Sequence, residues 1–310
     1  MSEHWSAYWA SGALTSLPED FRENYEGELA AFWYRQLKTL PDNSHIVDVC
    51  TGNLALPLLF CEQAEKKQRH WHISAVDIAH IDTAIIAQRF PKKEKYLADI
   101  QVLDNTAVES LNETLTNPVD FISSQYGLEY CSADDIAPVL AALLKPGGRL
   151  AFVAHATDSA IAHTMQSELL AYEKLVELGV FRLIARFGKG DINADKFAKQ
   201  LPKKVQTLTA LQQQSPHPLV AGVLNALGGL QRLPVNALKQ ERANALEFAK
   251  AYEYAHLRNR DVLAVSQKIL NKPTWYQAFS DAGLNLLDKG ELHYKGRHKA
   301  GSFFVFGKPE

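Results

Sequence analysis

The sequence predicts an α/β fold in which helices cover both faces of a doubly wound, mostly parallel sheet. Three observations support this prediction. Apolar segments of strand length alternate with helical segments from residue 44 to about residue 157. Several strand-like segments begin or end next to an aspartate. The alternation then stops and resumes near residue 272, so the core is predicted to carry a large helical insertion between its fifth and sixth strands.

Composition narrows the class of protein. The chain has 310 residues, 46% hydrophobic and 22% charged, so it is long enough to bury a sizeable core. Its net charge of -2 gives no global signature of a nucleic-acid-binding protein. We find no signal-peptide pattern at the first residues and no apolar run long enough to span a bilayer. Three scattered cysteines fit neither a disulfide framework nor a zinc site, so we expect a cytoplasmic protein without a metal centre.

Residues 1–43 are predicted to form a helical, aromatic cap. Pro18, followed by two acidic residues, indicates a helix start. Helical spacing then places four residues on one face: Tyr25, Leu29, Phe32 and Trp33. Two interpretations remain open for this cap. It is either a helix packed on the core or a flap over a cofactor pocket.

Residues 44–157 and 272–310 supply the predicted core. The predicted strands are residues 44–50, 72–77, 96–100, 119–125, 149–155, 285–294 and 301–306. Helices are predicted after Asn53, which can cap the first of them, and at residues 78–90, 136–144 and 275–281. A turn signal, Lys145-Pro146-Gly147-Gly148, precedes the fifth strand. The short connection between the last two strands predicts an antiparallel hairpin.

Residues 158–271 are predicted to form the helical insertion, with breaks at residues 188–190 and at Pro202 and a long helix over residues 235–269. Its basic stripe comprises Lys189, Lys196, Lys199, Lys203 and Lys204. Because acidic residues share the segment and no aromatic residues suited to base stacking interleave with it, the stripe is interpreted as a solvated helix face. Long insertions without strands commonly act as lids or substrate pockets.

The strand ends of the predicted sheet suggest where a ligand binds. Right-handed crossovers bring the carboxyl ends of parallel strands to one edge, and ligands bind at that edge. We therefore expect residues 50–53, Asp77, Asp99, residues 124–126 and His155 to converge there. The loop containing Gly52 joins a strand to a helix start, whose backbone N–H groups favour an anionic group.

Four motifs occur in a characteristic order: Asp48-Val49-Cys50-Thr51-Gly52-Asn53-Leu54, Asp77, Asp99-Ile100 and Lys145-Pro146-Gly147-Gly148. With the terminal hairpin, this order resembles that of the class I (Rossmann-like) S-adenosylmethionine-dependent methyltransferases. The resemblance covers residues 44–157 and 272–310. Two glycines typical of the family are replaced, by Cys50 and Leu54, and the incomplete glycine pattern argues against a dinucleotide.

The resemblance implies S-adenosylmethionine as cofactor and S-adenosylhomocysteine as product. It assigns the methionine end to the Gly52 loop, the ribose hydroxyls to Asp77, and the adenine to Ile78, Asp99 and Ile100. The predicted cofactor-binding residues are Asp48, Cys50, Thr51, Gly52, Asn53, Asp77, Ile78, Asp99, Ile100, Ser124, Gln125 and Tyr126. Structural alternatives are an ordinary turn at Gly52, a helix cap at Asp77 and a turn aspartate at Asp99.

His155, Tyr126 and Glu129 are the catalytic candidates. Methyl transfer requires alignment of the acceptor and, where the acceptor is protonated, a base. His155 follows the fifth predicted strand, although a structural histidine is an equal alternative there.

The predicted function is methyl transfer to oxygen or nitrogen of a small molecule by a monomer or homodimer, without nucleic acid or membrane. The alternatives are an RNA or protein methyltransferase and a non-catalytic scaffold that binds the cofactor.

Overall fold

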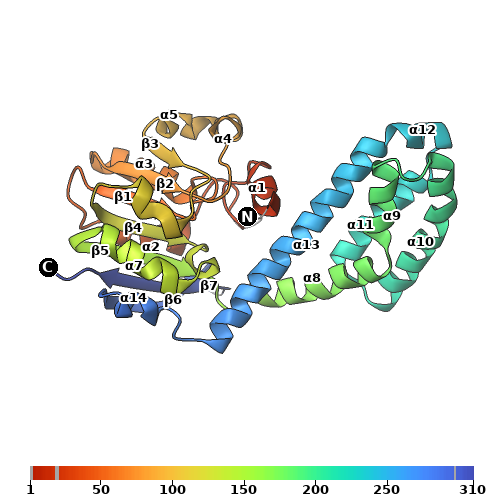
Figure 1. Cartoon of the computed structure of the whole chain (residues 1–310). Helices are drawn as coiled ribbons and strands as arrows, with labels where there is room; N and C mark the ends of the chain where they lie inside the picture. Colours follow the sequence, from red (N-terminus) through yellow and green to blue (C-terminus); the bar gives the residue numbers. More distant parts are fainter. Residues whose placement is uncertain (1–2, 18–20, 297) are drawn as a thin grey trace. The chain divides into compact units, whose positions relative to one another are not determined.

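The computed structural model describes residues 3–17, 21–296 and 298–310 (Figure 1). The chain divides into two compact units. The core unit comprises Met1–Ala162 and Ala264–Glu310, and the helical unit comprises His163–Leu263. The predicted helix start at Pro18, Glu19 and Asp20 lies outside the described residues.

The core unit contains a seven-stranded sheet with the order β3-β2-β1-β4-β5-β7-β6. Its strands are β1 (His45–Val49), β2 (His72–Val76), β3 (Ile100–Leu103), β4 (Val119–Gln125), β5 (Leu144–Ala154), β6 (Asn285–Tyr294) and β7 (His298–Gly307). The pairs among β1 to β5 are parallel, whereas β7 is antiparallel to both β5 and β6. The predicted doubly wound sheet with an antiparallel last strand is confirmed.

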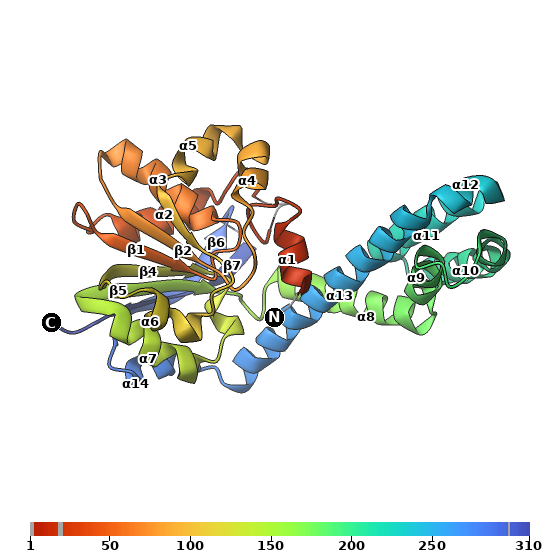
Figure 2. The same ribbon diagram turned by 45° about the horizontal axis from the view of Figure 1, so that its top comes forward.

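Helices cover both faces of this sheet (Figure 2). The helices outside the insertion are α1 (Glu3–Trp9), α2 (Gly27–Leu37), α3 (Ala55–Lys67), α4 (Thr83–Arg89), α5 (Glu94–Leu97), α6 (Leu111–Thr114), α7 (Ala133–Leu143) and α14 (Gln277–Asp281), with short 3-10 turns η1 (Pro91–Lys93), η2 (Val108–Ser110) and η3 (Leu128–Tyr130). Successive strand residues point to opposite faces, so Ile46 packs with α2 and α3 while Val47 packs with α7 and α14. Burying one such side chain contributes about 1.5–3 kcal/mol.

The third strand and the helix before it differ from the prediction. The strand predicted at residues 96–100 is wrong, because α5 occupies Glu94–Leu97 and β3 begins at Ile100. The register pairs Ile100 with Ile73 and so continues the apolar pattern of β2. The helix predicted at residues 78–90 begins only at Thr83, where Asp82 caps it by accepting from the N–H groups of Ala84 and Ile85 at 2.9 and 3.3 Å.

Two local predictions around the strands also need correction. Asn53 does not cap α3; the N-cap is Leu54, at φ 66°, and its side chain makes no capping hydrogen bond. The turn predicted at residues 145–148 lies within β5, where the pairing with β4 shifts register and Gly147 adopts φ 73°. A β-bulge thus accommodates the glycines within β5, and the strand continues beyond them.

The helical unit and the segments that lead into it confirm the predicted insertion between β5 and β6. The helices are α8 (Ala160–Glu177), α9 (Val180–Gly188), α10 (Ala194–Gln214), α11 (Pro218–Gln231), α12 (Val235–Gln240) and α13 (Arg242–Asn271). Its interior is built around Phe187, which stacks on Phe197 with ring centroids 4.1 Å apart. These contacts give the unit an apolar core of its own.

The helix boundaries inside this insertion differ from the prediction. A further break occurs at Gly179, whose φ of 65° separates α8 from α9 before the first predicted break at residues 188–190. Pro202 does not interrupt α10, because the fully buried Phe197, Leu201 and Leu208 anchor the helix on both sides of it. The long helix predicted at residues 235–269 is divided at Glu241 into α12 and α13.

Candidate cofactor and acceptor site

The candidate site lies at the carboxyl edge of the parallel strands in the core unit. The strand order reverses between β1 and β4, and ligands of doubly wound sheets bind at such a reversal. Residues 50–52 follow β1, Asp77 follows β2, Tyr126 follows β4 and His155 follows β5. The structure therefore brings these predicted residues to one edge.

Asp77 ties the loop after β1 to the loop after β2. One carboxylate oxygen accepts the backbone N–H of Gly52 at 2.7 Å, and the other accepts that of Ala79 at 2.7 Å. Burial raises the pKa of Asp77, and these backbone bonds oppose the rise. Since α4 begins at Thr83 and is capped by Asp82, Asp77 is not the cap of that helix. Its bonds instead fix the shape of the Gly52 loop.

Asp48 supports the loop from within the sheet. Its side chain is 1% exposed, and Ser123 of β4 donates a hydrogen bond to it at 2.6 Å. Burial raises the pKa of Asp48 from 3.8 to about 7. Asp48 therefore joins β1 to β4 beneath the point where the strand order reverses.

The raised pKa of Asp48 predicts a specific dependence of stability on pH. Between pH 3.8 and about 7 the folded chain holds a proton on Asp48 that the unfolded chain releases. Stability is therefore expected to fall as the pH rises through this window, by on the order of 4 kcal/mol from this residue. Urea unfolding across the window should show that Asp48→Asn removes this slope.

The control for this experiment is Asp281→Asn, which alters an exposed aspartate of α14. It should keep the slope of the unaltered protein. An Asp48→Asn variant with the same slope would contradict the assignment of the titration to Asp48.

Helix α1 and the residues that follow it, here called the aromatic segment, lie directly on the Gly52 loop. A Cβ at Gly52 would stand 2.5 Å from a ring atom of Trp9, so the indole contacts the glycine backbone. The Asn53 side chain donates to the carbonyls of Trp9 and Ala13 at 2.7 and 2.8 Å. No residue of α1 is buried, although it carries Trp5, Tyr8 and Trp9. The aromatic segment thus covers the loop while its own rings stay partly exposed.

This contact makes Gly52→Ala a sensitive probe. Gly52 has φ 56°, which strains any other residue, and the added Cβ would overlap the indole. We expect a loss of about 1–3 kcal/mol in urea unfolding. Gly296→Ala is the matched control, because Gly296 has φ 64° and no atom within 4 Å of an added Cβ. Equal losses for the two variants would show that the Trp9 contact contributes nothing.

Glu129 and His155 form a buried pair at the same edge. One oxygen of Glu129 accepts both the backbone N–H of His155, at 2.8 Å, and its ring Nδ1, at 2.7 Å. The Glu129 side chain is 1% exposed and that of His155 is 13% exposed. With Nδ1 donating to the carboxylate, Nε2 is the basic nitrogen of the ring. The pair therefore has the arrangement of an oriented general base.

Aromatic rings surround His155. The ring centroids of Tyr126 and His155 are 4.6 Å apart. The Tyr126 hydroxyl donates to the carbonyl of Ala300 at 2.8 Å. Tyr130 meets His155 edge-on at 5.9 Å, and Trp5 of α1 meets Tyr130 at 5.8 Å. The Tyr126 ring therefore holds the imidazole in place, because the hydrogen bond of its hydroxyl to β7 fixes the ring.

Several buried polar atoms at this edge have no hydrogen-bond partner among the described residues. They are Ser124 Oγ, Gln125 Nε2 and Glu129 Oε2. The other end of Gln125 accepts the indole N–H of Trp33 at 2.7 Å. Buried polar groups are rarely left unsatisfied, and a bound ligand is a common reason where they are. This set fits a site that receives a polar ligand.

Cys50 occupies the position of the first family glycine and is closely packed. A Cβ at Gly127, in the loop after β4, would stand 2.2 Å from the Cβ of Cys50. A hydrogen bond with Cys131, together with burial, raises the pKa of the Cys50 thiol, so it stays protonated. Cys50 therefore packs the loop after β1 against the loop after β4, and its protonated thiol adds no charge.

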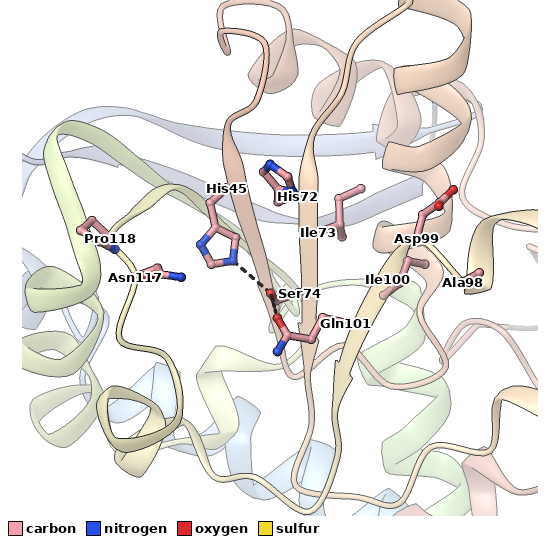
Figure 3. A pocket seen from close by; sticks show the side chains of 10 residues that line it. All are labelled: His45, His72, Ile73, Ser74, Ala98, Asp99, Ile100, Gln101, Asn117 and Pro118. Atoms are coloured by element: carbon pink, nitrogen blue, oxygen red, sulfur yellow. Dashed lines mark hydrogen bonds between the residues drawn. The ribbon is translucent and has the colours of Figure 1, made fainter.

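Asp99 and Ile100 do not lie at this edge, and the predicted placement is wrong. They stand at the amino end of β3, beside His45 and His72, which begin β1 and β2. There they line a cavity of about 590 Å³ (Figure 3). Across that cavity Ser74 bonds to His45 at 3.0 Å and to Gln101 at 3.1 Å. Asp99 and Ile100 lie at this end of the sheet because β3 begins where the prediction ended it.

Asp104 takes the position that was predicted for Asp99. It follows β3 directly, and its carboxylate contacts His80 Nδ1 at 2.5 Å and the N–H of Ile81 at 3.4 Å. The sequence carried the same signal there as at Asp77, an apolar run that ends in an acid. Because the strand was predicted to end at residue 100, Asp104 was not identified as the acid that follows it.

Two further features concern the described residues as a whole. Among them, no group of three or more His, Cys, Asp or Glu side chains is placed to hold a metal ion. None of their helices is long and apolar enough to cross a membrane.

Comparisons with known proteins give structural matches of low sequence identity. No family model and no curated protein matches the sequence. TrmN from Thermus thermophilus matches with 13% identity and a TM-score of 0.43 over 98% of this chain and 53% of TrmN. Phosphoethanolamine N-methyltransferase 2 from Haemonchus contortus, solved with S-adenosyl-L-methionine, matches with 11% identity and a TM-score of 0.40 over 98% of this chain and 57% of the other.

A third structure is the 16S rRNA (adenine(1408)-N(1))-methyltransferase from Catenulisporales acidiphilia, in a mutant form. It matches with 13% identity and a TM-score of 0.39 over 91% of this chain and 92% of the other. The chain thus spans about half the length of the first of these structures. The seven-stranded sheet, the reversed β7 and the insertion between β5 and β6 agree with the fold that the sequence predicts.

Proposed function

We propose that this protein is an S-adenosylmethionine-dependent methyltransferase that acts on oxygen or nitrogen of a small molecule. The observation that carries the proposal is the carboxylate of Asp77 bound to the Gly52 amide where the strand order reverses. The Glu129–His155 pair stands at the same edge, as a methyl transfer with a protonated acceptor requires.

The residues of the edge fit the cofactor. The start of α3 offers backbone N–H groups to a carboxylate, whereas the N–H groups of Thr51 and Gly52 already donate to Val76 and Asp77. Asp77 has further acceptor capacity for ribose hydroxyls, and Ile78 beside it is 45% exposed and suits the face of a base. Asp104, in place of Asp99, is the acceptor for an exocyclic amine. Ser124, Gln125 and Glu129 supply the buried polar atoms that lack a partner.

The remaining predicted residues support the loop. Asp48 holds β1 to β4, Cys50 packs against Gly127, and Asn53 holds the aromatic segment through two carbonyls. Thr51 bonds through its N–H to the carbonyl of Val76 at 3.0 Å and so aligns the loop with β2. We assign these four residues to the shape of the site.

The chemistry follows from this arrangement. The bound cofactor supplies an electrophilic methyl group on a sulfonium. The acceptor proton passes to His155 Nε2, and Glu129 stabilises the imidazolium through Nδ1. Tyr126 keeps the ring oriented. Trp9 lies against the Gly52 backbone and covers the loop on that side.

Calorimetry with S-adenosylmethionine and S-adenosylhomocysteine tests the proposal. Saturable binding of both, with one site per chain, is expected. Failure of a folded sample to bind either compound would contradict it. A screen of small-molecule acceptors with isotopically labelled cofactor then tests turnover. Binding without transfer to any acceptor would favour the scaffold interpretation, and transfer only to RNA or protein would exclude a small-molecule acceptor.

A further inference from the structure

The side-chain amide of Gln125 has one end paired and the other end unpaired. Gln125 is the last residue of β4 and is 9% exposed. The indole N–H of Trp33 donates to Gln125 Oε1 at 2.7 Å, whereas Nε2 is buried and has no hydrogen-bond partner among the described residues. Because an indole N–H can only donate, the oxygen end of the amide must face Trp33. The two N–H donors of Nε2 therefore point away from it.

Trp33 holds the amide in this orientation. The indole is fully buried, and its ring centroid lies 5.0 Å from that of Phe32 and 6.0 Å from that of Phe60 in α3. A close-packed ring of this kind cannot turn to release the amide. A buried donor without an acceptor is costly, and a ligand oxygen would satisfy it. The end of β4 is thus prepared for a hydrogen-bond acceptor.

The order of the strands indicates which part of a bound cofactor meets this donor. Under the proposed function, Asp104 after β3 takes the adenine and Asp77 after β2 takes the ribose. β1 and β4 come next in the sheet, with neighbouring strands about 4.8 Å apart. The loops that follow β1 and β4 touch at Cys50 and Gly127. Since the methionine portion continues from the ribose through sulfur, it is expected over the ends of these two strands.

The methionine portion carries an ammonium group, which can only donate hydrogen bonds, and a carboxylate, which can only accept them. An N–H₂ donor is therefore complementary to the carboxylate, and such a bond is strengthened by the charge. We infer that Gln125 Nε2 binds the carboxylate of the cofactor and that Trp33 orients the amide for this contact. Gln125 is then a specificity residue, and Trp33 is a positioning residue. This inference rests on the proposed function.

The test compares two ligands that differ in the amino acid group. S-adenosylhomocysteine carries it, whereas 5′-methylthioadenosine keeps the adenine, the ribose and the sulfur but lacks it. Calorimetry on the full chain should show that S-adenosylhomocysteine binds at least roughly ten-fold more tightly. Equal affinities for the two ligands would overturn the inference.

Variants then locate the preference at Gln125. Gln125→Glu keeps an oxygen for Trp33 but replaces the N–H₂ group with an oxygen that repels a carboxylate. It should weaken the binding of S-adenosylhomocysteine by roughly ten-fold or more and leave that of 5′-methylthioadenosine within about two-fold. Gln125→Met removes the donor without adding charge, and Trp33→Phe removes the indole N–H. Each should cause a severalfold loss for S-adenosylhomocysteine alone.

Gln101→Glu is the matched control, because it adds the same charge at an exposed position on the opposite edge of the sheet. It should leave both affinities unchanged. Unchanged binding of S-adenosylhomocysteine by Gln125→Glu would overturn the inference, and so would equal losses for both ligands, which indicate a purely structural role. If circular dichroism shows that Gln125→Glu is unfolded, Gln125→Met decides by the same criterion. Failure of the folded, unaltered protein to bind either ligand would instead contradict the proposed function, so the two failures are distinguishable.

Discussion

His155→Ala is expected to lower kcat by roughly 10²–10⁴-fold, the usual contribution of a positioned general base. The effect should appear in kcat, because the proposed role of the imidazole is to take the acceptor proton and not to bind the cofactor. Glu129 fixes the ring through Nδ1 and the backbone N–H, so Glu129→Gln should lower kcat by a smaller factor. Initial rates with an acceptor from the screen, and cofactor affinity by calorimetry, separate the two effects.

His72→Ala is the matched control, because it removes an exposed imidazole from the opposite edge of the same sheet. It should leave kcat within about two-fold of that of the unaltered protein. If His155→Ala and His72→Ala had equal rates, His155 would be a structural residue and the acceptor would need no base. If His155→Ala also lost cofactor binding, its assignment to the acceptor side would be wrong.

The sequence predicted the strands whose ends are marked by local chemistry. β4 and β6 have the predicted bounds, because each is an apolar or alternating run between turn-forming residues. The position of β3 could not be predicted from the local sequence in the same way. Tyr96 and Leu97 are apolar enough for a strand, and only the pairing of Ile100 with Ile73 decides between the two positions.

The same limit applies to the site. Gly52, Asp77 and His155 were identifiable because each follows a strand, and parallel strands end at a common edge. The contact of Trp9 with Gly52 was not identifiable, because it joins segments that pack together only in the folded chain. The break at Gly179 could not be predicted either, because the sequence does not show which backbone conformation a glycine within a helical pattern adopts.

Asp77→Ala is expected to weaken the binding of S-adenosylmethionine by about 1–3 kcal/mol, or roughly 5- to 150-fold, the cost of charged hydrogen bonds to the ribose. The variant also leaves the Gly52 amide without its acceptor, so the loop loses the bond that fixes it. Calorimetry measures the affinity, and circular dichroism confirms that the variant is folded.

Asp99→Ala makes this experiment decisive, because it removes an exposed aspartate that the sequence had placed in the same site. The structure puts Asp99 at the amino end of β3 and Asp104 at the carboxyl end. We therefore expect unchanged affinity for Asp99→Ala and weaker binding for Asp104→Ala. Unchanged affinity in Asp77→Ala would remove that residue from the site. A loss in Asp99→Ala without one in Asp104→Ala would mean that the cofactor binds at the other edge of the sheet.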